Sequence, residues 1–320
     1  MFYVGAYTAD MGGTAEGIAV LGGLPDGSLE NLGLAATAAS PAYLATHGDL
    51  VYAASEGVGR VEAYRRAAGF ALERVADADA GGSAPCHLAR YGDTVITACY
   101  GDGHLGVLDA EPLALVQTLE GDGSGPHRAQ DGPRAHGTIA LDATTILSAD
   151  LGADRLHVHS LAGGRLTRTS SVSLPAGTGP RDFLRHPSGL LLVLGELGLT
   201  LLALDARLNI VAAVDLAGGE AEDHAAALST SADGRFVYAG LRGSNRISVT
   251  EVVDGGALRQ AGWIDAGGDW PRHHVVDGDV MHVAHQRSNS VASFRIRENG
   301  IPEQISAPIR VASPIFLLKA

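Results

Sequence analysis

The chain has 320 residues, of which 43 are glycine and only 18% are charged, and its formal net charge is −13. An acidic surface repels nucleic acids and anionic membranes, and no apolar stretch is long enough to span a bilayer, so we expect neither as a partner. Because no basic and then apolar signal segment opens the chain, and Cys86 and Cys99 are expected as buried thiols, we predict a cytoplasmic protein.

A polar or proline-bearing start followed by two apolar runs recurs seven times along the chain. Six copies carry a proline, at positions 41, 85, 133, 180, 271 and 314, so neighbouring prolines lie 43 to 48 residues apart except for one gap of 91. That gap spans the copy without a proline, which begins at residues 221–224. A period in the forties with several short strands per repeat is typical of β-propeller blades.

The elements in chain order predict how the ring closes. Three strands are expected at the N-terminus, over residues 2–7, 17–21 and 29–35. Four strands are expected in a complete copy, over residues 85–90, 94–100, 105–108 and 113–119. The last copy, residues 313–318, has one strand, so the N-terminal strands should complete its blade. We predict an all-β, seven-bladed β-propeller with four antiparallel strands per blade, as a single domain over residues 1–320.

The hairpin from Gly179 to Glu196 is the most informative repeat for function. Its tight turn brings the start of its first strand beside the end of its second, so Arg181 and Glu196 should meet. If every first strand lines the channel, the corresponding positions of all blades converge on one face. The starts of the first strands supply Tyr43, His87, His136, Arg181, His224, Arg272, His273 and Phe316. The ends of the second strands supply Tyr7, Glu56, Tyr100, Asp150, Glu196, Arg242 and Gln286.

Some of these residues favour a structural role and others a functional one. A single histidine at a turn is more often structural, whereas Arg181, Glu196 and Arg242 together favour function because unpaired charges in a channel are costly. Of the adjacent His273 and His274, at most one can face the channel. The loop over residues 121–132 is either a lid or a solvated insertion. Six further histidines are expected at the surface: His47, His104, His127, His157, His159 and His186.

Several sites of known spacing are missing from the sequence. Metal-ligand patterns, a phosphate-binding loop and a nucleophile elbow are all absent. We therefore expect no metal and no other cofactor.

Motifs along nearly the whole chain resemble those of the lactonase family of seven-bladed β-propellers, which includes bacterial 6-phosphogluconolactonases and fungal carboxymuconate cyclases. The matching segments are 3–8, 85–87, 135–137, 149–155, 179–181, 196–197, 232–238, 242–243 and 271–272. The resemblance places the family's working histidine, arginine, glutamate and second arginine on His136, Arg181, Glu196 and Arg242. The chain has Asp182, Gly195 and Arg134 where the family usually has His, Asn and His.

The resemblance implies metal-independent hydrolysis of a sugar-acid lactone similar to 6-phosphogluconolactone, in carbohydrate metabolism, at one mouth of the channel. Such a reaction needs a base for water and a cation for the tetrahedral oxyanion. We expect Glu196 or His136 as the base and Arg181 as the cation. The expected substrate-binding residues are Arg242 and Arg272, which would hold a phosphate or carboxylate, and His87, His224 and Gln286.

Two other functions use the same fold. A muconate-type lactonising cyclase would use Glu196 or His136 as an acid, and a non-catalytic propeller would bind another protein on its faces. The expected partner is a small anionic substrate, and we expect a monomer or a weak homo-oligomer.

Overall fold

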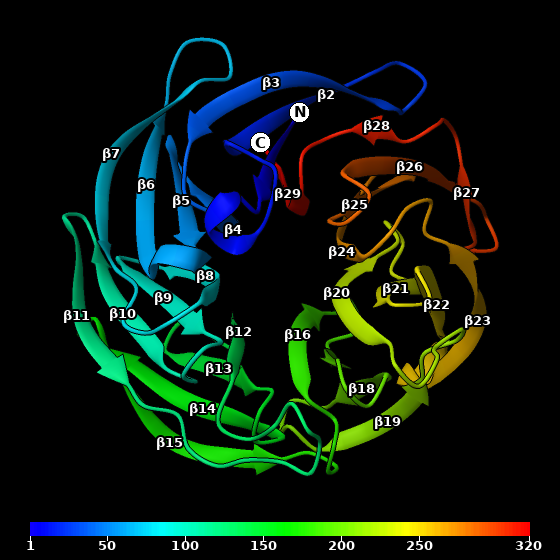
Figure 1. Ribbon diagram of the computed structural model, residues 1–320. Coiled ribbons are helices and arrows are strands. Elements are labelled where there is room, and N and C mark those ends of the chain that lie inside the picture. The colour runs from blue at the N-terminus through cyan, green and yellow to red at the C-terminus, as the bar shows by residue number, and fades with distance from the viewer.

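The computed structural model describes residues 1–320, apart from the side chain of residue 254. Seven antiparallel sheets stand radially around a central axis (Figure 1). Short apolar runs separated by Gly, Asp and Asn turns favour this arrangement, because each run forms one strand between two tight turns. The all-β, seven-bladed prediction is confirmed.

From the axis outward, the strands of each blade follow the order of the chain, except that the innermost strand of blade 1 is the last strand of the chain. Blade 1 contains β29 (Pro314–Lys319), β1 (Phe2–Ala6), β2 (Gly17–Gly23) and β3 (Leu29–Thr37). Blade 2 contains β4 (Pro41–His47), β5 (Leu50–Ser55), β6 (Arg60–Arg66) and β7 (Leu72–Asp79). Blade 3 contains β8 (Pro85–Tyr91), β9 (Thr94–Cys99), β10 (Leu105–Ala110) and β11 (Leu113–Leu119). Blade 4 contains β12 (Ala135–Ala140), β13 (Thr145–Asp150), β14 (Arg155–Ala162) and β15 (Arg165–Ser173).

The remaining blades repeat this plan. Blade 5 contains β16 (Pro180–Arg185), β17 (Leu191–Gly195), β18 (Thr200–Leu204) and β19 (Ile210–Asp215). Blade 6 contains β20 (His224–Thr230), β21 (Phe236–Arg242), β22 (Arg246–Val252) and β23 (Leu258–Asp265). Blade 7 contains β24 (Pro271–Asp277), β25 (Val280–His285), β26 (Ser290–Ile296), β27 (Pro302–Gln304) and β28 (Ile309–Arg310). Three short 3₁₀ helices are described, η1 (Ala9–Met11), η2 (Glu56–Val58) and η3 (Asp254–Gly256), and no described helix is long and apolar enough to cross a membrane.

Both ends of the chain meet in blade 1. β29 pairs antiparallel with β1, with Phe2 opposite Lys319 and Gly5 opposite Phe316. The backbone N–H of Ala320 donates to the carbonyl of Met1 at 3.1 Å. The ring is therefore closed by the N-terminal strands pairing with the C-terminal strand, as predicted (Figure 1).

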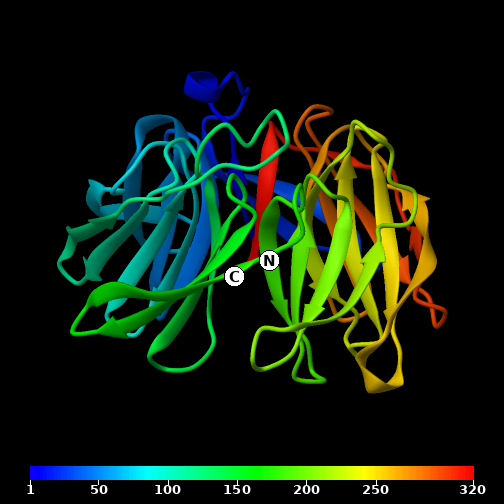
Figure 2. The same cartoon turned by 90° about the horizontal axis from the view of Figure 1, so that it is seen from below.

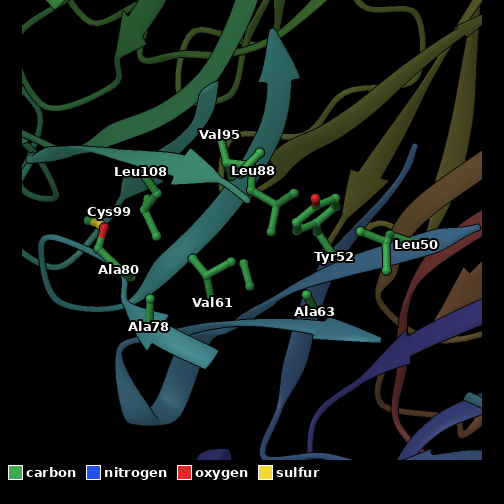
Figure 3. Packing of buried hydrophobic residues seen from close by; sticks show 12 residues of the cluster. Leu50, Tyr52, Val61, Ala63, Ala78, Ala80, Leu88, Val95, Cys99 and Leu108 are labelled. Carbon is green, nitrogen blue, oxygen red and sulfur yellow. The ribbon is translucent and has the colours of Figure 1, made fainter. Parts of the chain in front are cut away.

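The core lies between neighbouring blades rather than inside any one of them. Figure 3 shows one such layer, in which Tyr52 and Val61 of blade 2 pack with Leu88 and Leu108 of blade 3. Because a blade has a neighbour on each side, both faces of its inner strands are buried. This explains continuous apolar runs such as Leu191–Leu194.

The same burial corrects the prediction that six histidines lie at the surface. His157 and His159 are buried because they lie on β14, a third strand that its neighbours still cover, and His186 is buried in the turn after β16. His159 bonds the Ser148 hydroxyl at 2.9 Å, and burial lowers the pKa of His159 to about 3. His186 donates from Nε2 to the carbonyl of Gly234, 2.6 Å away. These three side chains support the blades and do not reach a surface.

Candidate functional site

Every blade carries a β-bulge near the start of its innermost strand. In each of the seven, the pairing with the second strand skips one residue, directly after the first paired position in six blades and after the third in blade 6. The skipped residues are Ile315, Ala42, Cys86, His136, Arg181, Ala227 and Arg272. A bulge re-aims its extra side chain, and all seven of these residues line one cavity on the axis.

Five of the seven innermost strands also supply the residue directly after the bulge, which forms a second, deeper ring. It supplies Tyr43, His87, Asp182, His273 and Phe316 to the same cavity. The cavity measures about 60 Å³, which is room for a few water molecules at roughly 10–15 Å³ each, so a sugar-sized ligand would have to extend toward the channel mouth.

Four of the deeper side chains form an aromatic arc on one side of the cavity. The ring centroids of Tyr43 lie 4.4 Å from His87 and 4.1 Å from Phe316, and Phe316 lies 4.1 Å from His273. Burial lowers the pKa of His87 to about 4, and burial with the charges of His274 and Arg181 lowers that of His273 to about 3. Both imidazoles are therefore neutral, and the arc offers ring surfaces rather than charge.

Charged residues of blades 5 and 6 meet beside this cavity. Arg181 contacts Oε2 of Glu196 through Nη1, and Arg242 reaches Oε1 of Glu196 at 2.8 Å. His224 Nδ1 lies 3.0 Å from the same Oε1. Arg242 also donates from Nε to the His224 carbonyl at 3.1 Å. The hairpin therefore brings Arg181 and Glu196 together, and the next blade adds a second cation.

Both oxygens of Glu196 are occupied by these contacts. Burial alone would raise the pKa of Glu196, but Arg242 and Arg181, with the hydrogen bond from His224, hold it well below its usual 4.5. Glu196 is only 6% exposed and does not line the cavity. Its geometry suits it to fix the two guanidinium groups.

A second ion pair links Arg272 of blade 7 to Glu56, which follows β5 of blade 2, with Tyr7 of blade 1 between them. The Arg272 guanidinium donates to the Tyr7 hydroxyl at 2.7 Å, and this hydroxyl donates to Glu56 Oε2 at 2.7 Å. Arg272 and Glu56 themselves are 3.8 Å apart. Burial opposes the charge, yet the Tyr7 hydroxyl and the Glu56 carboxylate raise the pKa of Arg272. Arg272 lines the cavity with a partner already in place.

His136 stands next to Arg181 in the bulge ring. Burial, reinforced by the positive charge of Arg181, lowers the pKa of His136 well below 6.5, so its imidazole is neutral at neutral pH. The ring packs edge-on against Tyr100, with centroids 6.0 Å apart. Among the residues that the structure describes, none hydrogen-bonds the His136 ring nitrogens.

Other residues predicted for the site lie at its edge or outside it. His224 stands at the rim and contacts Glu196 rather than the cavity. Gln286 does not line the cavity, and its Oε1 is buried without a described hydrogen-bond partner. His273 faces the cavity while His274 turns away to the Tyr238 carbonyl, at 3.2 Å, so only one of the pair points inward as expected.

The segment between β11 and β12 crosses the face of the ring that carries the site. Gln130 is buried and donates to the Leu151 carbonyl and to Asp154, each at 2.8 Å. Arg128 pairs with Glu222, which precedes β20, at 2.9 Å. Figure 2 shows this segment rising from the same face as η1. It is anchored to blade 4 and reaches the start of blade 6, so it passes over blade 5.

Trp270 is strained at the edge of the site. Its backbone φ is 68°, in the left-handed region that costs a bulky residue about 1–2 kcal/mol. The equivalent positions before Pro41, Pro85 and Pro314 carry small residues with positive φ. The Trp270 ring stacks with the guanidinium of Arg242, with Cζ 5.6 Å from the ring centroid. The positive φ itself recurs at the entry to the innermost strand of other blades, and in blade 7 this position holds a bulky residue.

For Tyr7 and Glu56 the sequence predicts only a position at the end of a second strand, with no separate role in the site. The signal that could have found them is their position, which is the same as that of Glu196 and Arg242 in their blades. Among the described side chains, no three His, Cys, Asp or Glu gather as a metal ion would require.

Known proteins share both the sequence pattern and the fold. A family model described as lactonase, 7-bladed beta-propeller, matches residues 1–318. A Bacillus subtilis protein named 6-phosphogluconolactonase is 29% identical over 97% of this chain and 96% of its own length.

Two solved structures superpose on nearly the whole ring. The periplasmic gluconolactonase of Pseudomonas aeruginosa has a TM-score of 0.91 and 26% identity, with 99% of this chain and 97% of that chain covered. A protein from Lactobacillus plantarum has a TM-score of 0.91 and 25% identity, with 99% and 98% covered. With the family model matched from end to end, this chain belongs to the lactonase family of seven-bladed β-propellers.

Proposed function

We propose that this protein hydrolyses the lactone of a sugar acid in the cavity at the mouth of the channel. The observation that carries this proposal is a neutral imidazole, His136, beside the buried guanidinium of Arg181, with both side chains delivered by β-bulges. Relatives named 6-phosphogluconolactonase and gluconolactonase support the same reaction class.

His136 is the group placed to activate water. Its unprotonated nitrogen takes a proton as the water oxygen attacks the lactone carbonyl, and Arg181 stabilises the oxyanion of the tetrahedral intermediate. The intermediate then expels the ring oxygen, to which the imidazolium returns the proton. The carboxylic acid product loses one proton to solvent. Water is consumed, one C–O bond forms and one breaks, and no oxidant or reductant is needed.

Glu196 is the positioning group in this scheme. Its carboxylate holds Arg181 and Arg242 at fixed orientations and offsets their charge in a buried site. An ionised Glu196 also lacks the proton that a lactonising cyclase would take from a general acid, so the arrangement favours hydrolysis over cyclisation.

His136→Gln tests the proposal. Glutamine keeps a polar side chain of similar length but cannot serve as a base, and a positioned base typically contributes about 10²- to 10⁴-fold. We expect kcat on a panel of aldonic acid lactones, with and without phosphate, to fall by that factor while circular dichroism stays unchanged. The matched control is His47→Gln, at an exposed position on β4. An unchanged kcat in His136→Gln would remove this residue from the mechanism.

A further inference from the structure

The charges around the cavity balance one another. Three guanidinium and three carboxyl groups stand in its wall or directly behind it: Arg181, Arg242, Arg272, Glu56, Glu196 and Asp182. The histidines that line the cavity are neutral. The site therefore holds no excess positive charge for an incoming anion.

Each arginine already has carboxylate or hydroxyl partners. Arg181 and Arg242 share Glu196, and Arg272 is held by Tyr7 and Glu56. A phosphate binds tightly where several donors are free to converge on it. In this cavity it would have to displace buried ion pairs, and breaking such a pair leaves a charge without its partner.

Asp182 adds a carboxylate to the cavity wall itself. It follows the bulged Arg181 and belongs to the deeper ring that contains Tyr43. Its Oδ1 accepts the N–H of Phe183 at 2.9 Å, and its Oδ2 accepts the N–H of Leu228, in the next blade, at 2.8 Å. Burial raises the pKa of Asp182, while these two N–H groups and the charge of Arg181 oppose the rise. Each oxygen keeps a lone pair, so the cavity side of Asp182 can accept hydroxyl groups, and in its ionised form it repels phosphate.

Two further arginines, Arg134 and Arg287, do not line the cavity. Arg134 pairs with Asp131 at 2.8 Å and donates to the Gly101 carbonyl at 2.6 Å. Arg287 stacks on the ring of Trp270, 3.5 Å from its centroid, and does not line the cavity.

We propose that the site takes an uncharged, polyhydroxylated lactone without a phosphate group, and that Asp182 sets this preference. This inference rests on the proposed lactone hydrolysis and names its substrate class. Hydroxyl groups of the sugar donate to Asp182, and the C–H face of the ring packs on the arc of Tyr43, Phe316 and His273. Negative charge develops only at the reacting carbonyl, where Arg181 stands.

The test measures kcat/KM for glucono-1,5-lactone and for its 6-phosphate on the same enzyme preparation. The ratio of the two kcat/KM values does not depend on the fraction of folded enzyme, so it can be compared with the wild type even for a variant that folds poorly. We expect the wild type to favour the uncharged lactone at least tenfold, and Asp182→Asn to lower that ratio at least tenfold, because like charges in contact repel and a tenfold ratio corresponds to only about 1.4 kcal/mol.

Asp93→Asn is the matched control. It changes the net charge by the same amount at a fully exposed carboxylate outside the channel, so its ratio should stay at the wild-type value. A wild-type preference for the 6-phosphate, or an equal change of the ratio in both variants, would overturn the inference while leaving lactone hydrolysis in place. Hydrolysis of neither lactone would overturn the proposed function as well.

Discussion

Glu196 shows what residue-level reasoning could and could not predict. Its meeting with Arg181 followed from the hairpin, because a tight turn aligns the two strand ends. That Arg242 would bind the other oxygen was not predictable, since it depends on how the next blade is rotated about the axis. Arg242 and Arg272, which were expected to hold the substrate's anion, both have partners in the protein.

Glu196→Gln is predicted to destabilise the protein in a pH-dependent way. A carboxyl whose pKa is lowered by folding stabilises the fold above its unfolded value of about 4.5, and this contribution is lost as the pH falls through the folded value. At pH 7 the variant leaves two buried guanidinium groups without their carboxylate, so the free energy of unfolding should drop by about 3–5 kcal/mol. The difference from wild type should narrow in acid, below about pH 4.5.

Denaturant unfolding at neutral pH and at successively lower pH measures this difference. Glu298→Gln, at an exposed turn, should match the wild type at every pH. A gap that stays constant with pH would show that the charge of Glu196 is not the stabilising feature.

At the scale of the element, the bulge of each innermost strand decides which side chains reach the cavity. The repeats made the strands and their order predictable, because proline, glycine and the apolar runs recur with the blade period. The bulge was not predictable, since one skipped residue leaves the hydrophobic pattern almost unchanged while it re-aims the side chain. His136, Arg181 and Arg272 were therefore proposed for the site without the feature that they share.

Two alanine-to-leucine substitutions in blade 2 should separate activity from stability. Ala42 is a bulged residue that faces the cavity, so Ala42→Leu should fill the space for substrate and lower kcat/KM by roughly tenfold or more with little loss of stability. Ala54 lies in the core between blades 2 and 3, so Ala54→Leu should lower the free energy of unfolding by about 1–3 kcal/mol. Thermal unfolding and lactone hydrolysis measured on both variants check this. If Ala42→Leu proved the less stable of the two, the bulged position would not be open to the cavity.

For the whole molecule, closure of the ring removes the exposed edges that an open array of sheets would leave. β29 supplies the innermost strand of blade 1, and it also delivers Ile315 and Phe316 to the cavity. Stability and site assembly therefore depend on the same contact between the two ends of the chain.

Moving the chain ends without breaking this contact should leave the protein intact. Met1 and Ala320 are hydrogen-bonded, so a short Gly/Ser linker can join them, and new ends can open at the turn of Gly163 and Gly164 between β14 and β15. This permutant should keep cooperative thermal unfolding and lactone hydrolysis. A chain that stops at residue 312 lacks β29, so the backbone groups of β1 lose their partners, and both properties should be lost. A truncated chain that still unfolds cooperatively and hydrolyses lactone would mean that closure through blade 1 is dispensable.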